Sequence, residues 1–515
     1  MNSNRPSRFT GARSFRVLVL AAIATLAIAA PTLAKTYEST RTVARTLDLG
    51  DGTLRIEHRL GDVRIRTHSR PAVVVNATVR TSVSTSQEEA DRLAKDIEVI
   101  IRAEGREVLV RTEYPKVHKT FLFGGHISYS VDYEIVMPAT ARLDLTNRFG
   151  AVQVDGLGRA SRISNGHGRL VVHNAKGDQE ISNMFASIEA ENISGALDAR
   201  NSNGEVSVRR VSGSAFVESR FGSIEVSDVD GATDVSGANG SVEISGIKGA
   251  VTVTNSFGTV TASGLGSTLE VENRNGSIVA KDVQGRTRLD SSFDRIDFAG
   301  IRDSVTVENS NGQVRGSDIL GAVDVRNSFG TVELRDVQGA ATVSNQNGNT
   351  RIEGVGGNVV VTGKFGLVDV SNVKGSLRID TANGEIKAGS VGGAADLETS
   401  FAPIFLSGAG GNVKAVNSNG SIRVDGISQS GSECRDVELS ATFGTIQVDL
   451  PANAGYRVNA NTSFGKIDSE LPITLQGVVR SSSQTTSDRL SGTIGDGRCT
   501  LTLNNRNGSI RIGKE

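Results

Sequence analysis

Apolar and polar residues alternate along this chain in short runs, and the runs recur every 18 residues. Each unit opens on a landmark residue, which is Asn in one copy and Phe in the next and is usually followed by Gly. The alternation continues over 12 steps without a slip, at Asn203, Phe221, Asn239, Phe257, Asn275, Phe293, Asn311, Phe329, Asn347, Phe365, Asn383, Phe401 and Asn419. A fixed period of this kind is typical of repeat architectures.

Three columns of the unit are apolar, at the third, eighth and fourteenth residues after the landmark, as at Val314, Ile319 and Val325. β-Branched residues dominate these columns, which favours strands over helices. Glycine fills the tenth position in ten of the twelve units. This predicts a corner whose backbone conformation a Cβ would oppose. We therefore expect two or three short strands per unit, joined by tight corners.

A single unit cannot bury its apolar residues, whereas stacked units build a continuous core. The sequence thus predicts an all-β fold, a right-handed parallel β-solenoid with coils of about 18 residues. About 20 coils at roughly 4.8 Å each would form a rod on the order of 100 Å long. The pattern leaves open whether the cross-section is flat or triangular. A propeller is the alternative, although its blades need about 40 residues.

Two polar features of the repeat are interpreted as structural. The Phe–Asn alternation at the landmark is expected to fill the core with large and small side chains in turn. The sixteenth position is expected to form a stacked amide ladder. Its members are Asn255, Asn273, Asn309, Asn327, Asn345 and Asn417.

Residues 1–34 have the pattern of a signal peptide, in which a basic stretch precedes an apolar run and a small-residue cleavage site between Ala34 and Lys35. The alternative, a membrane anchor, needs about 20 apolar residues, and this run is shorter. Three further segments follow: an N-terminal α+β capping module at 35–138, β-solenoid repeats at 139–432, and irregular C-terminal coils and a cap at 433–515.

Within the capping module, a helix is expected at 86–97, where Ser86 and Glu89 form a capping box. Strands are expected at 53–60, 63–67, 73–81, 108–112 and 128–136. The loop 115–126 combines basic and aromatic residues and is either a binding tip or a segment folded over the core. Its candidate binding residues are His118, Lys119, Phe121 and Phe123.

Composition narrows the function classes. The net charge is −1, Trp is absent and aromatic residues are 4% of the chain, so no basic stripe or aromatic platform for nucleic acid is predicted. The two cysteines, Cys434 and Cys499, fall in the C-terminal cap. An exported chain meets an oxidising compartment, which favours a disulfide between them over two separate buried thiols. No metal or other cofactor is expected.

Catalytic residues are not predicted. Asp228, Asp282, Asp318 and Asp336 all lie seven residues after a landmark, and residues that recur with a repeat usually belong to its structure. His167 lies in a Gly-His-Gly triplet that resembles a motif of β-helical pectin hydrolases, but the accompanying aspartates and basic residues are missing. We interpret His167 as a corner residue.

Several segments together resemble the bacterial putative-adhesin family, whose β-strand-repeat domain has no assigned function. They are 50–80, the acidic helix SQEEADRLAKDI (86–97), VDYEIVMPATARLDLTNRFGAVQVDG (131–156), the NGxV and FGxV coils, and the tail LSGTIGDGRCTLTLNNRNGSIRI (490–512). The resemblance covers nearly all of 40–515 and implies a right-handed β-solenoid at the cell envelope, adhesive or structural. It supplies no catalytic residue.

The leading hypothesis is a non-catalytic, exported cell-envelope protein, an adhesin or scaffold that binds an envelope or surface glycan or protein. Its location would be periplasmic, on the cell surface or secreted, with no membrane span after signal cleavage. One alternative is a polysaccharide-active lyase or hydrolase, which needs paired carboxylates facing one cleft. Another is a periplasmic accessory protein whose partner docks on the N-terminal module.

Overall fold

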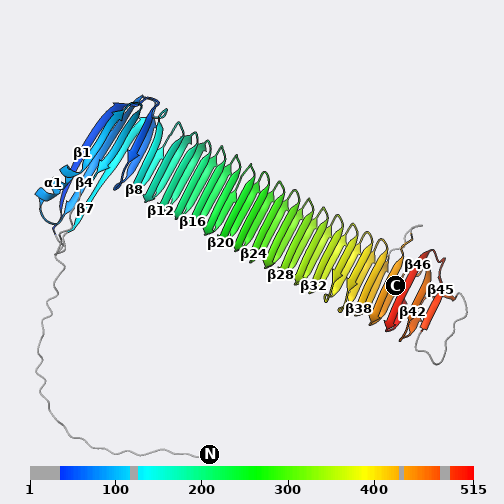
Figure 1. Ribbon diagram of the computed structural model, residues 1–515. Coiled ribbons are helices and arrows are strands. Elements are labelled where there is room, and N and C mark those ends of the chain that lie inside the picture. Colours follow the sequence, from blue (N-terminus) through cyan, green and yellow to red (C-terminus); the bar gives the residue numbers. More distant parts are fainter. Residues whose placement is uncertain (1–34, 116–125, 428–433, 476–487) are drawn as a thin grey trace, which may run out of the picture.

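The computed structural model describes residues 35–115, 126–427, 434–475 and 488–515, which form a long rod of strands (Figure 1). Strands make up 68% of the described residues, and about 16 turns of roughly 18 residues stack as a parallel β-solenoid. The predicted fold is therefore confirmed.

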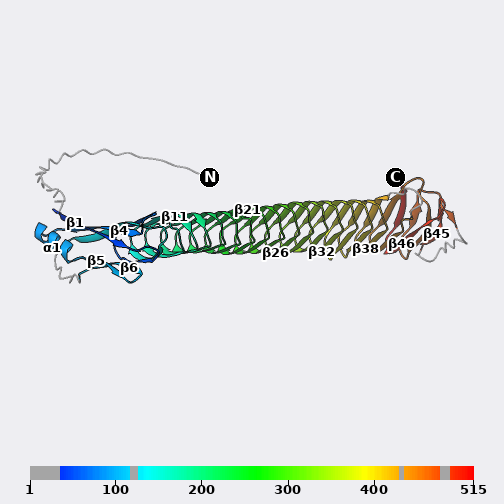
Figure 2. The same ribbon diagram turned by 90° about the horizontal axis from the view of Figure 1, so that it is seen from above.

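Each coil consists of two strands, one in each of two parallel sheets that face each other along the rod (Figure 2). One sheet contains β9 Val152–Asp155, β11 Leu170–Lys176, β13 Ile188–Ser194, β15 Val206–Val211, β17 Ile224–Val229, β19 Val242–Ser245, β21 Val260–Leu265, β23 Ile278–Val283, β25 Ile296–Ile301, β27 Val314–Ile319, β29 Val332–Val337, β31 Thr350–Val355, β33 Val368–Val373, β35 Ile386–Val391, β37 Ile404–Ala409, β39 Ile422–Ile427 and β41 Ile446–Leu450.

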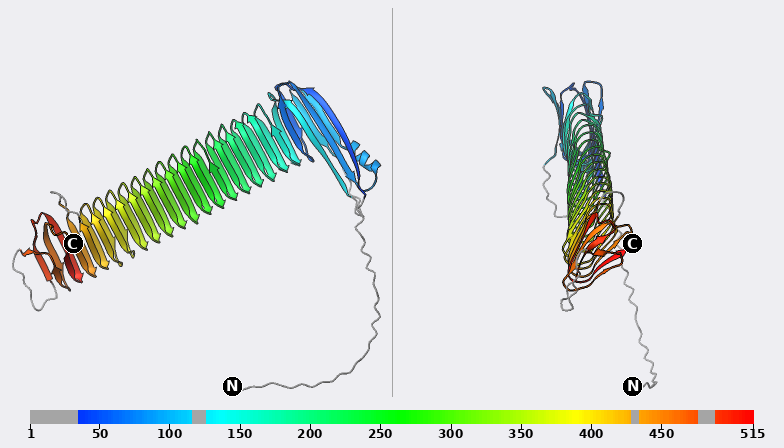
Figure 3. Two further views of the ribbon diagram at one scale, coloured as in Figure 1. Left: turned by 180° about the vertical axis from the view of Figure 1, so that it is seen from behind. Right: turned by 90° about the vertical axis from the view of Figure 1, so that its right-hand side faces the viewer.

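The second sheet contains β8 Arg142–Phe149, β10 Ser161–His167, β12 Gln179–Phe185, β14 Leu197–Asn203, β16 Ala215–Phe221, β18 Thr233–Asn239, β20 Val251–Phe257, β22 Leu269–Asn275, β24 Thr287–Phe293, β26 Val305–Asn311, β28 Val323–Phe329, β30 Ala341–Asn347, β32 Val359–Phe365, β34 Leu377–Thr381, β36 Ala395–Thr399, β38 Val413–Asn419 and β40 Val437–Phe443. With two strands per coil the cross-section is flat, and the oblique view along the rod at the right of Figure 3 shows the narrow stack.

The core lies between the two sheets. Val314, Ile319 and Val325, from the three predicted apolar columns, are fully buried. Each residue pairs with its equivalent 18 positions along the chain, as Val314 does with Val332. The columns therefore stack valine on valine, and each full burial contributes about 1.5–3 kcal/mol.

All six asparagines of the predicted amide ladder are buried, but of these six only Asn327 and Asn345 are hydrogen-bonded amide to amide. Asn327 Nδ2 donates to Asn345 Oδ1 at 3.3 Å. Asn345 Nδ2 in turn donates to the carbonyl oxygen of Gly330 in the preceding coil at 3.1 Å. The ladder thus satisfies backbone carbonyls at one corner of the stack, which would otherwise be buried without a partner.

The glycine column at the tenth position has a different cause from the one expected. Positive φ angles occur elsewhere in the unit, but not at Gly231 or Gly339. Instead, a Cβ on Gly231 would lie 2.5 Å from the carbonyl oxygen of Gly213, one coil below. A Cβ on Gly339 would lie at the same distance from the carbonyl oxygen of Gly321. The corner needs glycine because consecutive coils approach each other too closely for a side chain.

The N-terminal strands lie at an angle to the rod (Figure 1). β1 Tyr37–Asp48, β4 Ala72–Val83 and β7 Ile127–Pro138 pair antiparallel. The predicted helix is α1 Gln87–Asp96, where the Ser86 side chain accepts from the Glu89 amide. It is followed by the hairpin of β5 Glu98–Glu104 and β6 Glu107–Glu113.

The stack of parallel coils begins inside the segment predicted as the capping module. β2 Thr53–Glu57 and β3 Val63–His68 pair in parallel with β8 and β9. They form a coil of their own, and β4 to β7 are an excursion between this coil and the next.

The last coil in sequence is not the last in space. The C-terminal elements are β42 Tyr456–Thr462, β43 Ile467–Ser469, β44 Thr474–Leu475, β45 Asp488–Ile494, β46 Cys499–Asn507 and β47 Ile510–Lys514. β46 lies between β40 and β42, and β47 lies between β41 and β43. The final repeat thus inserts beneath the coil that precedes it in the chain.

Candidate functional site

Phenylalanines line one long edge of the rod. We call this column the Phe ladder; it consists of Phe149, Phe185, Phe221, Phe257, Phe293, Phe329, Phe365, Phe401, Phe443 and Phe464. All but Phe149 are exposed, with 42–61% of each residue open to solvent. The expectation that these rings fill the core was wrong. The strand alternation ends at the inward sixteenth position, and the chain then turns into the corner, so the landmark side chain points outward.

Smaller polar side chains separate the rings of the ladder. At the N-terminal end the spacer is His167, whose ring stacks between Phe149 and Phe185 with centroids 4.6 and 4.5 Å apart. His167 is thus a landmark residue at a corner, as predicted. In later coils the spacer is Asn, and Asn203 Nδ2 donates to the backbone oxygen of Met184 at 3.2 Å.

The ladder keeps its alternation where the chain order changes. Phe443 pairs with Asn507, which comes from the inserted final coil. Phe464 follows in space, because its amide donates to the oxygen of Arg506 and Gly465 stacks on Gly508. The spatial order is therefore Phe, Asn, Phe, although the sequence order is Phe, Phe, Asn.

Sequence reasoning missed this surface, although a signal for it was present. The landmark column accepts Phe, Asn and His167 in neighbouring coils. Packed interiors tolerate changes of volume poorly, so a column with such different side chains is better placed outside the core.

One group of side chains could hold a metal ion by its donor types. His173, Glu189 and Glu191 lie within 4.8 Å of one another, and His173 Nε2 is 3.1 Å from Glu189. Both carboxylates already have cationic partners, since Arg169 pairs with Glu189 and Arg210 pairs with Glu191. Partial burial pushes the pKa of Glu189 upward, but Arg169 and His173 outweigh it and hold that pKa below its ordinary value. The group is a surface ion-pair network.

A second carboxylate group lies on an outward strand face. Burial, and then the charge of Glu308, raises the pKa of Asp290. Arg288 lies between the two carboxylates, 3.6 Å from Asp290 and 3.4 Å from Glu308. With a guanidinium bridging them, they do not form the separated acid and nucleophile of a glycosidase.

The repeated aspartates seven residues after the landmark have a backbone role. Asp228, Asp282, Asp318 and Asp336 all have φ between 52 and 56°. Glycine occupies the same column in other coils, as at Gly354 with φ 74°. Asp, Asn and Gly tolerate this left-handed conformation best, so the column is structural, as predicted.

A groove of about 810 Å³ runs along the outer face of the sheet that starts with β8, beside the first coils. Its lining includes small side chains such as Ala196 and Ala232. Two of its carboxylates are paired with arginines, Glu180 with Arg162 at 2.9 Å and Asp198 with Arg200 at 2.7 Å. These two carboxylates are therefore not free for acid–base chemistry.

The 18-residue coils with Asn-Gly and Phe-Gly corners now have a counterpart among known proteins. Residues 267–513 match the family model Toastrack DUF4097. These residues form a Toastrack domain.

The other comparisons add little to the Toastrack assignment. No curated protein matches the chain. A crystal structure from Clostridium sporogenes, described as a putative cell adhesion protein, covers 40% of this chain and 99% of its own length. Its identity is 10% and its TM-score is 0.22. We draw no argument from a likeness at that TM-score.

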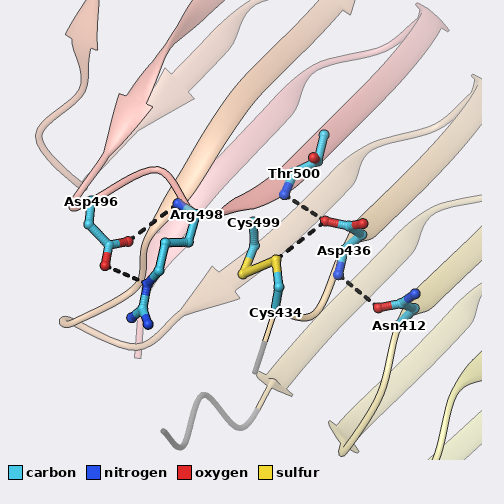
Figure 4. Close-up of a disulfide and its surroundings, with 7 residues drawn as sticks. All are labelled: Asn412, Cys434, Asp436, Asp496, Arg498, Cys499 and Thr500. Carbon is cyan, nitrogen blue, oxygen red and sulfur yellow. Dashed lines mark hydrogen bonds and ion pairs between the residues drawn. A yellow bond between two sulfur atoms is a disulfide. The ribbon is translucent and has the colours of Figure 1, made fainter. Parts of the chain in front are cut away.

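The Toastrack domain contains both cysteines. The structure pairs Cys434 with Cys499 as a disulfide, with the Cα atoms 5.2 Å apart (Figure 4). Nearby, Asp436 accepts from the amide of Thr500 at 2.8 Å, and its own amide donates to Asn412 at 3.0 Å. The disulfide and these bonds fasten the inserted coil to the coil below it.

The remaining predicted site residues precede the Toastrack domain. Ala34 and the candidate binding loop with His118, Lys119, Phe121 and Phe123 lie outside the described residues. Lys35 is described, and its Nζ lies 5.0 Å from the ring centroid of Tyr37. In the part of the chain that the structure describes, no helix is long and apolar enough to cross a membrane.

Proposed function

We propose that this protein is a non-catalytic, exported cell-envelope rod that serves as an adhesin or scaffold. The observation that carries the proposal is the uniformity of the solenoid. About 16 coils repeat the same two strands and the same outward columns, so a ligand meets the same surface many times. A repeated surface suits binding spread along a rod, whereas catalysis needs one convergent site.

The charged side chains support a binding role over catalysis. The carboxylates around Glu189 and Asp290 are paired with arginines. In the groove along the first coils, Glu180 and Asp198 are likewise each paired with an arginine. A retaining or inverting glycosidase needs two carboxyl groups of different pKa facing the same bond.

Two features support export. The first 34 residues have the signal-peptide pattern. The disulfide between Cys434 and Cys499 belongs to an oxidising compartment, because cytosolic proteins rarely keep such bonds. The envelope location is the part of the proposal that fractionation tests directly: the mature chain is expected in the periplasmic or surface fraction and not in the cytosol.

The function is tested by co-sedimentation of residues 35–515 with isolated cell envelopes and insoluble polysaccharides, with the supernatant assayed for released sugar. We expect the protein in the pellet and no released sugar. Sugar release would overturn the proposal in favour of a polysaccharide-active enzyme. Binding that disappears when residues 116–125 alone are deleted would favour an accessory protein that docks through that loop.

A further inference from the structure

The Phe ladder has a regular pitch along the rod. Its rings recur every second coil, and parallel strands lie about 4.8 Å apart, so successive rings are separated by about 9.6 Å. The N-terminal end shows what fits between two of them. His167 occupies the space between Phe149 and Phe185 as a third, nearly parallel ring, 4.6 and 4.5 Å from its neighbours. The gap between successive phenylalanine rings of the ladder therefore has room for one aromatic ring stacked between them.

In the coils that follow, the gap is partly open. Asparagine takes the place of His167, and its side chain is shorter than a phenylalanine ring. The amides of Asn203, Asn239 and Asn347 lie against the rod, because each donates to a backbone oxygen of the preceding coil at 3.2–3.3 Å. The outer part of each gap is left free between two exposed rings.

We propose that the Phe ladder pairs two copies of this chain, antiparallel along their length, with the phenylalanines of each copy seated over the asparagines of the other. A second copy has the same spacing between its phenylalanine rings along the whole rod. If one of its rings fits into a gap of the first copy, the other rings therefore fit into the other gaps. A two-fold axis perpendicular to the rods lets Phe meet Asn at every level. A two-fold axis parallel to the rods would set each ring against its own equivalent, so the pairing is antiparallel and closed.

The area and the charge of this edge suit such a pair. About half of each of nine rings is exposed, which at ~200 Å² per aromatic side chain gives about 900 Å² per copy. A stable interface needs ~800 Å² per partner. Serine precedes the landmark at four of the five central positions, and Arg274 is the one charged residue there; the serines are Ser256, Ser292, Ser310 and Ser328. The centre of the edge therefore carries few like charges to repel a second copy.

The test is the mass of residues 35–515 in solution, which contain every described element, measured by sedimentation equilibrium. We expect a dimer at about 10 µM. The substitutions Phe257→Asn, Phe293→Asn and Phe329→Asn together are expected to weaken it at least about 100-fold. They should not unfold the rod, because Asn occupies the same column in the neighbouring coils. Phe405→Asn is the matched control, since Phe405 is exposed on a strand face away from the ladder.

A second variant separates seating in the gaps from general stickiness. Asn275→Phe with Asn311→Phe fills two gaps, as His167 does naturally, and adds apolar surface. Weakened pairing of this variant supports the proposal, whereas stronger association overturns it. A wild-type chain that stays monomeric at about 100 µM also overturns it. If that monomer loses envelope binding on Phe→Asn substitution, the ladder serves a different partner. The pairing can fail while the envelope-binding function stands, because the two assays are independent.

Discussion

At the scale of single residues, the interior is matched in volume from one coil to the next. Phe298 points into the core and is 2% exposed. A Cβ on Gly316, in the next coil, would lie 2.3 Å from Cζ of Phe298 and 3.0 Å from Leu334. Phe298 is therefore accommodated by small residues in the two neighbouring coils, Ala280 and Gly316, at this one place in the column.

Gly316→Val should accordingly overpack the core and destabilise the protein by about 1–3 kcal/mol. Phe298→Val in the same chain should restore most of that loss, because valine is common at inward positions of the repeat. The measurement is the denaturation midpoint of each variant, together with hydrogen exchange of β25 and β27. Additive losses in the double variant would contradict this explanation.

A buried histidine makes the N-terminal region sensitive to acid. His58 Nδ1 lies 3.1 Å from Thr112 Oγ1, which in turn lies 2.7 Å from Tyr133 Oη. Burial lowers the pKa of His58 to about 4, against an ordinary 6.5, although the charge of Asp132 opposes the shift. Between these two values the unfolded chain binds more protons than the folded one, so stability falls as the pH falls.

The loss should reach about 3 kcal/mol near pH 4 relative to pH 7.5. His58→Gln should flatten this part of the pH profile while lowering stability at pH 7.5 only modestly. Thermal midpoints between pH 7.5 and 4, with hydrogen exchange of β2 and β7, provide the check. An unchanged slope in His58→Gln would assign the acid sensitivity to other groups.

At the scale of the elements, the strand after each landmark carries a bend that the sequence encodes. In β29, Val332 and Leu334 point inward, Arg335 and Asp336 both point outward, and Val337 points inward again. The break in alternation falls at the left-handed φ of 52° at Asp336. This bend is why the eighth position, and not the seventh or ninth, is apolar.

Asp336→Gly should leave stability nearly unchanged, because glycine adopts this conformation without strain. Asp336→Val should cost about 1–2 kcal/mol, since a β-branched residue is strained there. The comparison is one of thermal midpoints at the same pH. Equal losses in the two variants would show that the carboxylate, and not the backbone conformation, is what the column requires.

The elements also show where prediction from sequence ends. The repeating strands and α1 were predictable because each has a local pattern, such as period-2 alternation or the Ser86 cap. β1 and the hairpin strand β5 were missed, since their outward faces give weak alternation. The insertion of β46 between β40 and β42 depends on contacts across the chain that no local pattern encodes.

At the scale of the whole molecule, two periods have different roles. The 18-residue period of the apolar columns determines the rod, whereas the 36-residue period of Phe at the landmark determines the surface along one edge. The first follows from burial and was readable from the apolar columns. The second concerns exposed residues, on which burial places no constraint, so its meaning depends on what lies against the rod. That is why the solenoid was predictable from the sequence and the exposure of the Phe ladder was not.

Deletions separate these two periods. Removing residues 204–239 takes out two coils and leaves Asn203 followed in the ladder by Phe257, so the alternation survives. Removing 222–239 takes out one coil and sets Phe221 directly below Phe257. Both variants should fold, because the inward columns stay in register and solenoid stability is a sum over coils. Both deletions avoid Gly316, whose loss would press Phe298 against a larger side chain.

If the ladder pairs two copies, the deletions should differ in association and not in stability. The two-coil deletion should still dimerise, with a modest loss in proportion to its shorter edge. The one-coil deletion shifts the rings on one side of the junction by half a pitch, so rings from the two sides meet each other across the antiparallel pair and no longer meet asparagines. Its dimer should be weaker than that of the shorter two-coil variant. Sedimentation equilibrium of both gives the answer, and equal association would mean that the alternation of Phe and Asn does not govern pairing.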